Sequence, residues 1–422
     1  MTKETIENCQ ETEKIFLVMV REKKHHSQWT IKDNLGEMKE LIVACGGEVV
    51  DAMTCMIDKP TAGFLINEKK AGEIAAYCQN ISVDTIIFGA DLKGSQQRNL
   101  ERIFKTRTID RTQLILDIFA KHASSKEGKV QVELAQLEYL LPRLVGKGVE
   151  LSRLGGGIGT LGPGETKLEI DRRKISQRID RLKKLIGEVS QKRALTRKKR
   201  RDRCVPALSL VGYTNAGKST LLNHLTEANQ VTCNGYFTTL DPLSRQLVLP
   251  NHQKVILSDT VGFMHNLPHH LIKAFYATLE EVKEADVLLH VLDVSHEHFR
   301  NLYDSVNEVL KELESFEKTS ILVLNKIDRL TDTHWLEEFE NNFDHAVCVS
   351  AKTGEGIGDL LTKIVEVLSV LITEIDVEVP MDRMDLVSLA HEEGEVCSIK
   401  YYEKIINIRA FVPKHIAARF YK

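Results

Sequence analysis

Residues 207–219 read Ala-Leu-Ser-Leu-Val-Gly-Tyr-Thr-Asn-Ala-Gly-Lys-Ser, and this stretch decides the fold. Its apolar start predicts a buried strand, and the two glycines followed by Lys218 and Ser219 form a P-loop pattern that opens a helix. Glycines let backbone N–H groups converge on a polyphosphate, and the helix N-terminus adds positive partial charge. The stretch therefore predicts a nucleotide site in which Lys218 reaches the β- and γ-phosphates and Ser219 binds Mg²⁺.

Three further motifs follow in order, each after an apolar run that predicts a strand. Asp259-Thr260-Val261-Gly262 places a carboxylate for Mg²⁺ and a glycine that lets a backbone N–H approach the γ-phosphate. Asn325-Lys326-Ile327-Asp328 supplies an ionised acid that only accepts hydrogen bonds, which suits the N1–H and N2–H₂ donors of guanine. Ser350-Ala351-Lys352 fits the loop that closes over the base. Together the motifs predict a GTP-binding domain.

Length and composition limit the alternatives. A chain of 422 residues is expected to form two to four domains, and its net charge of −3 means that any nucleic-acid-binding surface must be local. The eight cysteines include no C-x-x-C pair, which favours reduced thiols over disulfides or zinc. The sequence shows no signal peptide and no apolar run of membrane-spanning length, so we expect a cytoplasmic protein, with a part of it peripheral to the membrane.

The pattern divides the chain into four predicted domains. Residues 1–110 alternate strands and helices, with a strand at 15–20, a helix capped by Asp33 and ended by Gly46-Gly47, and a strand at 85–88, which indicates a small parallel α/β domain. Residues 111–203 carry apolar residues in steps of four and three on both sides of a glycine-rich loop, which predicts an antiparallel helical hairpin with a basic linker. Residues 204–373 predict the doubly wound, mainly parallel sheet of a P-loop GTPase, and residues 374–422 a small α+β domain.

The glycine-rich loop at 155–164 contains a G-x-G-x-x-G pattern but lacks the context of a dinucleotide site. The residues before it make a poor strand, and Pro163-Gly164 interrupts the point where a helix should open. Two interpretations stay open: a flexible hairpin turn, or a tip with few side chains that slides between RNA backbones. The basic run at 192–201 is likewise either a solvated helix end or an RNA contact.

Several segments together resemble the HflX family of translational GTPases over nearly the whole chain. They are the GTP motifs with residues 95–100, 109–112, 127–137, 155–169, 237–242, 267–268, 275 and 278–281. The resemblance implies a ribosome-associated GTPase that binds the large subunit and, in its GTP state, splits or rescues stalled or idle ribosomes, often under heat stress. It also implies that the loop at 155–164 points into ribosomal RNA near the peptidyl-transferase centre.

The resemblance adds residues to the site. Thr239, with Thr238 as the fallback, matches the switch threonine that contacts the γ-phosphate and Mg²⁺. Asn215 matches a K⁺ ligand of the P-loop, although a role in stabilising the turn explains this asparagine equally well. We predict Lys218, Thr239 and Gly262 as catalytic, and Ser219, Thr239 and Asp259 as Mg²⁺ ligands. The predicted GTP-binding set is Gly212, Tyr213, Thr214, Asn215, Ala216, Gly217, Lys218, Ser219, Thr220, Phe237, Thr238, Thr239, Asp259, Thr260, Val261, Gly262, Asn325, Lys326, Asp328, Ser350, Ala351 and Lys352.

Three positions depart from the patterns. Phe263 stands where Ras-like proteins carry the water-orienting Gln, so intrinsic hydrolysis should be slow and the ribosome should supply the missing element. Leu161 stands where the family usually has Arg, which removes a cation from the loop tip. Residues 65–70 lack the glycine-rich stretch that the family predicts near Phe64, which argues against ATP binding by the N-terminal domain.

Three functions compete. The leading prediction is a monomeric, Mg²⁺-dependent GTP hydrolase that binds GTP and GDP and remodels ribosomes through the large subunit. The second is an anti-association or hibernation factor that uses GTP with little turnover, which Phe263 favours. The third, a GTPase for RNA modification or remodelling, ranks low because no methyl-donor, folate or helicase site is present. The histidines near His290 and His296 lack metal-site spacing and are predicted to be ordinary polar residues.

Overall fold

The computed structural model describes residues 12–23, 29–144, 163–201, 205–226, 243–264, 276–331, 334–340, 342–393, 395–402 and 404–421. The chain divides into two compact units, Met1–Lys184 (unit 1) and Leu185–Lys422 (unit 2). The finer domain boundaries at 110, 203 and 373 remain predictions. Within the described ranges, no helix is both long enough and apolar enough to cross a membrane.

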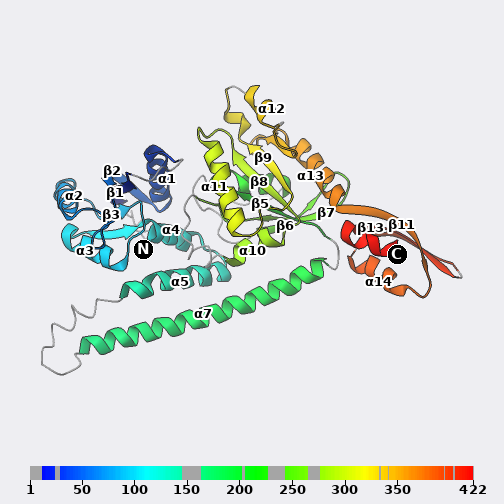
Figure 1. Ribbon diagram of the computed structural model, residues 1–422, viewed down its shortest axis with the longest axis horizontal. Coiled ribbons are helices and arrows are strands. Elements are labelled where there is room, and N and C mark those ends of the chain that lie inside the picture. The colour runs from blue at the N-terminus through cyan, green and yellow to red at the C-terminus, as the bar shows by residue number, and fades with distance from the viewer. Residues whose placement is uncertain are drawn as a thin grey trace, which may run out of the picture. The chain divides into compact units, whose positions relative to one another are not determined.

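Unit 1 contains a four-stranded parallel sheet with strand order β2-β1-β3-β4 (Figure 1). The fully buried rings of Phe16 and Phe88 pack in its core with Leu100 of a covering helix. The predicted parallel α/β arrangement is confirmed. Its elements are β1 (Glu13–Glu22), α1 (Ile31–Ala44), β2 (Gly47–Ile57), α2 (Glu68–Ile81), β3 (Thr85–Phe88), α3 (Gly94–Phe104), β4 (Arg107–Asp110) and α4 (Arg111–His122).

The start of α1 differs from the prediction that Asp33 caps it. Thr30 is the cap: its Oγ1 accepts a hydrogen bond from the Asp33 N–H at 3.2 Å, and Asp33 Oδ2 accepts one from the Thr30 N–H at 3.0 Å. This reciprocal pair is a capping box, in which the acid acts from the third helical position. The helix therefore begins one turn earlier than predicted.

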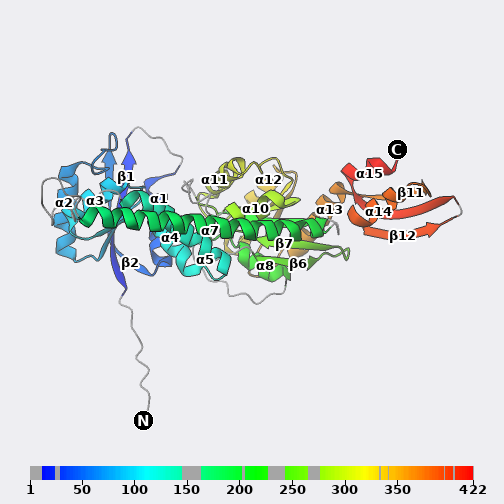
Figure 2. The same cartoon turned by 90° about the horizontal axis from the view of Figure 1, so that it is seen from below.

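Two helices follow in place of the single long first arm that the apolar spacing predicts. The chain breaks after α4, and α5 (Lys126–Leu140) starts at a new cap, Ser125, before the short helix η1 (Leu141–Leu144). The second arm is α7 (Pro163–Arg201), an unbroken helix of 39 residues, about 58 Å long (Figure 2). Two ion pairs join α5 to α7, Arg178 to Glu133 at 2.7 Å and Lys183 to Glu138 at 2.8 Å, so the helical pair itself is confirmed.

The helix α7 also corrects the interpretation of Pro163-Gly164. These residues open the helix rather than interrupt it. Proline is well suited to a first helical position because its missing N–H would have no partner there and its φ angle is already helical. The rest of the glycine-rich loop, including Leu161, lies outside the described residues.

Unit 2 contains a six-stranded sheet with strand order β10-β9-β8-β5-β7-β6, in which only β6 is antiparallel to its neighbour (Figure 1). The predicted doubly wound P-loop fold is confirmed. The strands are β5 (Ala207–Gly212), β6 (Leu243–Val248), β7 (Lys254–Asp259), β8 (Val287–Asp293), β9 (Ser320–Asn325) and β10 (Ala346–Val349). The helices are α8 (Lys218–Thr226), α10 (Tyr276–Glu284), α11 (Phe299–Glu312), α12 (His334–Glu340) and α13 (Ile357–Leu371), with the short helix η2 (Ile327–Arg329).

The C-terminal part of unit 2 forms a separate antiparallel sheet with strand order β11-β13-β12. Its elements are β11 (Ile372–Pro380), α14 (Met384–Glu393), β12 (Glu395–Tyr401), β13 (Ile405–Pro413) and α15 (Lys414–Phe420). The predicted strand, helix, strand and strand are confirmed, and α15 is an addition. The buried residues Ile375, Ile408 and Phe420 give this sheet a core of its own.

A buried carboxylate holds the end of β4 in unit 1. Asp110 is fully buried and accepts hydrogen bonds from the backbone of Leu92 and Gln113, from Tyr139 Oη at 2.7 Å and from Arg143 Nη2 at 3.0 Å. Burial raises the pKa of Asp110, and the four donors oppose this effect by stabilising the charged form. The network fastens the end of α5 and η1 to the carboxyl edge of the sheet.

We expect Tyr139→Phe to lower the free energy of unfolding of unit 1 by about 1.5–3 kcal/mol, because it removes a donor from a buried charge. Tyr77→Phe is a matched control: Tyr77 also donates to a carboxylate, Asp51, at 2.5 Å, but it is exposed, so its loss should cost less than about 0.5 kcal/mol. Urea unfolding followed by the emission of Trp29, in a Trp335→Phe background, measures both. Equal costs for the two variants would contradict the importance of the buried network.

Candidate nucleotide-binding site

The loop between β5 and α8 requires glycine at both ends. A Cβ atom at Gly212 would lie 2.3 Å from the carbonyl oxygen of Val291, and one at Gly217 would lie 2.3 Å from Asn325 Nδ2. Both distances are far below any van der Waals contact, and Gly217 also has a φ of +96°. The backbone of the loop is therefore pressed against the neighbouring strands β8 and β9.

Lys218 is buried at the start of α8. Its ammonium donates hydrogen bonds to the carbonyl oxygens of Gly212 at 3.0 Å and Tyr213 at 2.8 Å, which hold it across the loop. Burial lowers the pKa of Lys218 to about 8, with Asp259 raising it and Lys326 lowering it further. A cation in this position meets a phosphate group with little solvent to displace.

The two described candidates for Mg²⁺ lie together. Ser219 Oγ donates a hydrogen bond to Asp259 Oδ2 at 2.6 Å, which joins the start of α8 to the end of β7. A hydroxyl and a carboxylate are hard oxygen ligands of the kind that Mg²⁺ prefers, so the donor set fits this ion. The third candidate, Thr239, lies outside the described residues, as do Phe237 and Thr238, and their roles remain predictions.

The segment after β7 is locked to the P-loop through its backbone. Phe263 N–H donates to the Gly212 carbonyl at 3.0 Å, and its carbonyl accepts from Thr214 N–H at 2.8 Å. The Phe263 side chain is buried, and the buried Thr260 hydroxyl donates to the Leu210 carbonyl at 2.6 Å. These two side chains therefore serve the fold of the loop. Val261 is also buried beside them.

Gly262 lies directly against the P-loop. A Cβ atom there would be 2.8 Å from Thr214 Cα and 3.2 Å from Lys218 Nζ. The absence of a side chain thus brings its backbone close to the lysine that is predicted to hold the phosphates. This places the predicted catalytic pair Lys218 and Gly262 side by side.

Asn325 connects three loops. Its Nδ2 donates to the Ala216 carbonyl at 2.8 Å and its Oδ1 accepts from Ala351 N–H at 3.0 Å. Asp328 Oδ1 accepts from Ser350 Oγ at 2.7 Å, so the predicted base-binding carboxylate is held by the predicted closing loop. The four motifs therefore meet around one site, with Thr220 half-buried on α8 and Lys352 exposed at the rim.

Asp293, at the end of β8, belongs to this constellation and was missed from the sequence. Lys326 has a left-handed φ of 69°, and its ammonium bridges the Asn215 carbonyl at 2.7 Å and Asp293 Oδ2 at 2.6 Å. The signal that could have found it is its place at the carboxyl end of the strand beside β5, where ligands of such sheets bind.

The histidines that could suggest a metal are spread over different elements. His290 lies inside β8, whereas His296 and His298 lie in the loop that follows, where the His298 N–H donates to the His296 ring. Across the described ranges, no group of three or more His, Cys, Asp or Glu side chains is placed to hold a metal ion.

Four protein-family models match the chain in succession. They are the GTP-binding GTPase N-terminal region over residues 32–120, the GTP-binding GTPase middle region over 122–200, the 50S ribosome-binding GTPase over 207–326 and the HflX C-terminal domain over 336–403. Together they cover most of the chain.

Curated relatives share this full length. The chain is 44% identical to the GTPase HflX of Caldanaerobacter subterraneus, covering 92% of this chain and 89% of the relative. It is 41% identical to that of Lacrimispora saccharolytica, covering 98% and 97%, and 43% identical to that of Escherichia coli, covering 80% and 79%. Among solved structures, a GTP-binding protein from Sulfolobus solfataricus in complex with GDP is 24% identical, covers 85% of this chain and 100% of its own, and aligns with a TM-score of 0.45. The chain therefore belongs to the HflX family of GTPases and is a GTP hydrolase of the P-loop class.

Proposed function

We propose that this GTPase binds the large ribosomal subunit in its GTP state and splits or rescues stalled or idle ribosomes under stress. The observation that carries the proposal is the junction of the four GTP motifs through Asn325, Asp328 and the P-loop, in a domain that matches a 50S ribosome-binding GTPase model. A site of this design holds the base and the phosphates at once, so the presence of the γ-phosphate can bias the loops that follow β7. We assign the protein to the cytoplasm as a monomer, with a fraction peripheral to the membrane.

Each residue has a definite task in this proposal. Lys218 and the P-loop amides hold the β- and γ-phosphates, Gly262 offers its backbone N–H to the γ-phosphate, and Asp328 accepts from the guanine edge. Ser219 and Asp259, with Thr239, hold Mg²⁺, which neutralises charge that develops on the phosphate oxygens. Tyr213, Thr214, Ala216, Ala351 and Lys352 complete the walls around the nucleotide.

The same site supports slow turnover by the isolated protein. Phe263 has no polar group with which to orient water, and its backbone bonds to Gly212 and Thr214 fix it in place. A missing catalytic element is worth about 10³–10⁵ in rate. In our proposal the ribosome supplies that element, and the observation also favours a second candidate, a GTP-regulated anti-association factor with little turnover of its own.

Exposed cations on α7 support binding to ribosomal RNA. Arg172, Arg173 and Lys174 are exposed on the first half of this helix, just after the loop at 155–164 that we propose to approach the peptidyl-transferase centre. Exposed surface cations bind phosphate backbones and release counterions when they do so.

We expect Asp328→Asn to weaken GTP binding by roughly 10⁴-fold, because the amide donates a hydrogen bond where the carboxylate accepted one. The variant should instead prefer xanthosine triphosphate, since xanthine carries an oxygen in place of the guanine amino group. Calorimetric titration with both nucleotides measures the change. Asp304→Asn, an exposed acid on α11, is the matched control and should leave both affinities unchanged. Retention of tight GTP binding by Asp328→Asn would contradict the assigned role.

Large-subunit binding should depend on the nucleotide and on salt. We expect more protein to co-sediment with isolated large subunits when a non-hydrolysable GTP analogue is bound than when GDP is bound. The triple variant Arg172→Gln/Arg173→Gln/Lys174→Gln should reduce the slope of log affinity against log salt by up to about 2–3, near 0.7–0.9 for each lost phosphate contact. Arg178→Gln/Lys183→Gln is the control, because those cations already pair with Glu133 and Glu138. Equal pelleting with both nucleotides would refute the proposal. Stimulation of GTP turnover by ribosomes separates the hydrolase from the anti-association factor.

The role of Asn215 is testable because its backbone is left-handed, with a φ of 61°. Glycine adopts this conformation freely, so Asn215→Gly keeps the turn and removes the side chain. If the side chain is a K⁺ ligand, the excess of ribosome-stimulated turnover in K⁺ over Na⁺ buffer should fall by about 10²-fold or to nothing. An unchanged K⁺ preference in this variant would assign Asn215 to the turn alone.

A further inference from the structure

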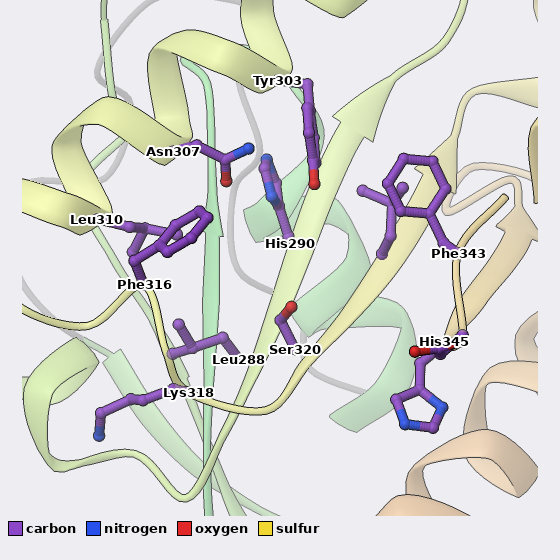
Figure 3. A pocket seen from close by; sticks show the side chains of 12 residues that line it. Leu288, His290, Tyr303, Asn307, Leu310, Phe316, Lys318, Ser320, Phe343 and His345 are labelled. Carbon is purple, nitrogen blue, oxygen red and sulfur yellow. The ribbon is translucent and has the colours of Figure 1, made fainter.

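A cavity of about 250 Å³ lies in unit 2 and is lined mainly by β8, α11 and the segments before β9 and β10 (Figure 3). Leu288 and His290 of β8 form its floor, Tyr303 and Asn307 of α11 form one wall, and Phe316 and Phe343 close it from the segments before β9 and β10. No residue of the four GTP motifs lines it. The lining of this cavity is therefore distinct from the four GTP motifs.

His290 presents a buried polar atom to this cavity. The side chain is only 3% exposed, its ring stacks on that of Tyr303 with centroids 5.0 Å apart, and its Nε2 has no hydrogen-bond partner among the residues that the structure describes. Burial lowers the pKa of His290 to about 3, and the positive charge of Lys218 adds to the effect, so the ring is neutral. A buried polar nitrogen without a partner is unfavourable unless something that enters the cavity bonds to it.

Two more polar groups face the same space. The amide of Asn307 and the hydroxyl of Tyr303 converge on the imidazole in Figure 3, and neither side chain forms a hydrogen bond within the described ranges of the chain. An amide supplies both a donor and an acceptor, and a neutral imidazole supplies either, according to its tautomer. The cavity thus has the half-buried Tyr303 and Asn307 as further donors and acceptors beside the buried His290 nitrogen.

The remaining walls select for shape and charge. Tyr303, Phe316 and Phe343 are aromatic, and such side chains pack well against a flat ring. The charged lining residues are Lys318 and Asp344, of opposite sign, and the Lys318 ammonium already donates to the carbonyls of Lys283 and Ala285. The cavity therefore has no net charge with which to attract an ion.

We infer that this cavity is a binding site for a small, uncharged, planar ring compound that carries an amide-type donor and acceptor, with His290 and Asn307 as its polar partners. The aromatic side chains pack against the ring, and the amide satisfies the imidazole nitrogen. The site does not depend on the ribosomal function proposed above, and its occupation is compatible with bound nucleotide.

Benzamide is the probe that tests this site. The full chain, saturated with GDP so that the nucleotide site is filled, is titrated with benzamide and followed by ligand-observed NMR and calorimetry. We expect saturable binding of one molecule per chain. Toluene lacks the amide, acetamide lacks the ring and benzoate is charged. Each should therefore bind at least about tenfold more weakly than benzamide, which corresponds to the loss of one hydrogen bond or of the packing against the ring.

Two variants assign the binding to the cavity. His290→Phe keeps a ring beside Tyr303 and removes the buried nitrogen, so it should reduce benzamide affinity by about tenfold or more while the variant still binds GDP. His345→Phe is the matched control, because His345 also lines the cavity but its ring points away from His290 (Figure 3). Any of three results overturns the inference. The first is that benzamide shows no saturable binding at any soluble concentration, which would leave water as the occupant, and the second is that it binds no better than toluene or acetamide. The third result is that His290→Phe binds benzamide as well as the parent protein does.

Discussion

The nucleotide site depends on one buried side chain, Asn325. Its amide donates to the P-loop at Ala216 and accepts from the closing loop at Ala351, and it is 1% exposed. Two hydrogen bonds made by one rigid amide fix the distance between the loop that is predicted to hold the phosphates and the loop that is predicted to face the base. The predicted guanine-binding and phosphate-binding loops therefore belong to a single connected structure.

Lys326 extends this connection to a second strand. Its left-handed backbone turns the side chain over the P-loop, where the ammonium bridges the Asn215 carbonyl and the carboxylate of Asp293. The pair of Lys326 and Asp293 is mostly buried, at 14% and 15% exposure, so breaking it by removing one partner would leave the other charge poorly solvated. This bridge links the carboxyl ends of β5, β8 and β9 at one edge of the sheet, and doubly wound sheets bind their ligands at that edge.

The sequence predicted the parts of this arrangement that rest on local pattern. Apolar runs ending in glycine, aspartate or asparagine located the strands β5, β7 and β9 and their motifs, because the chemistry of phosphates and guanine requires those residue types at strand ends. Asp293 escaped because its partner Lys326 is distant in the chain, and its place at the carboxyl end of β8 becomes a signal only once β8 is known to lie beside β5. The packing of Phe263 against the P-loop escaped for a similar reason, since a parallel bridge between two loops has no periodicity. In unit 1, Thr30 was passed over as the cap of α1 because both members of a capping box look like caps. The break before α5 was missed because the apolar seam that predicted the first arm begins only at Val130, inside α5.

The crowding around Gly212 limits which mutations of its codon the P-loop can accommodate. Its position beneath the carbonyl of Val291 leaves no room for even one methyl carbon. Every base change at the first or second place of a glycine codon introduces either a side chain or a stop, so every missense change at this codon forces the P-loop away from β8. Exposed positions of this protein can change one residue at a time without such a cost, whereas any change at the floor of the phosphate loop requires the backbone to move.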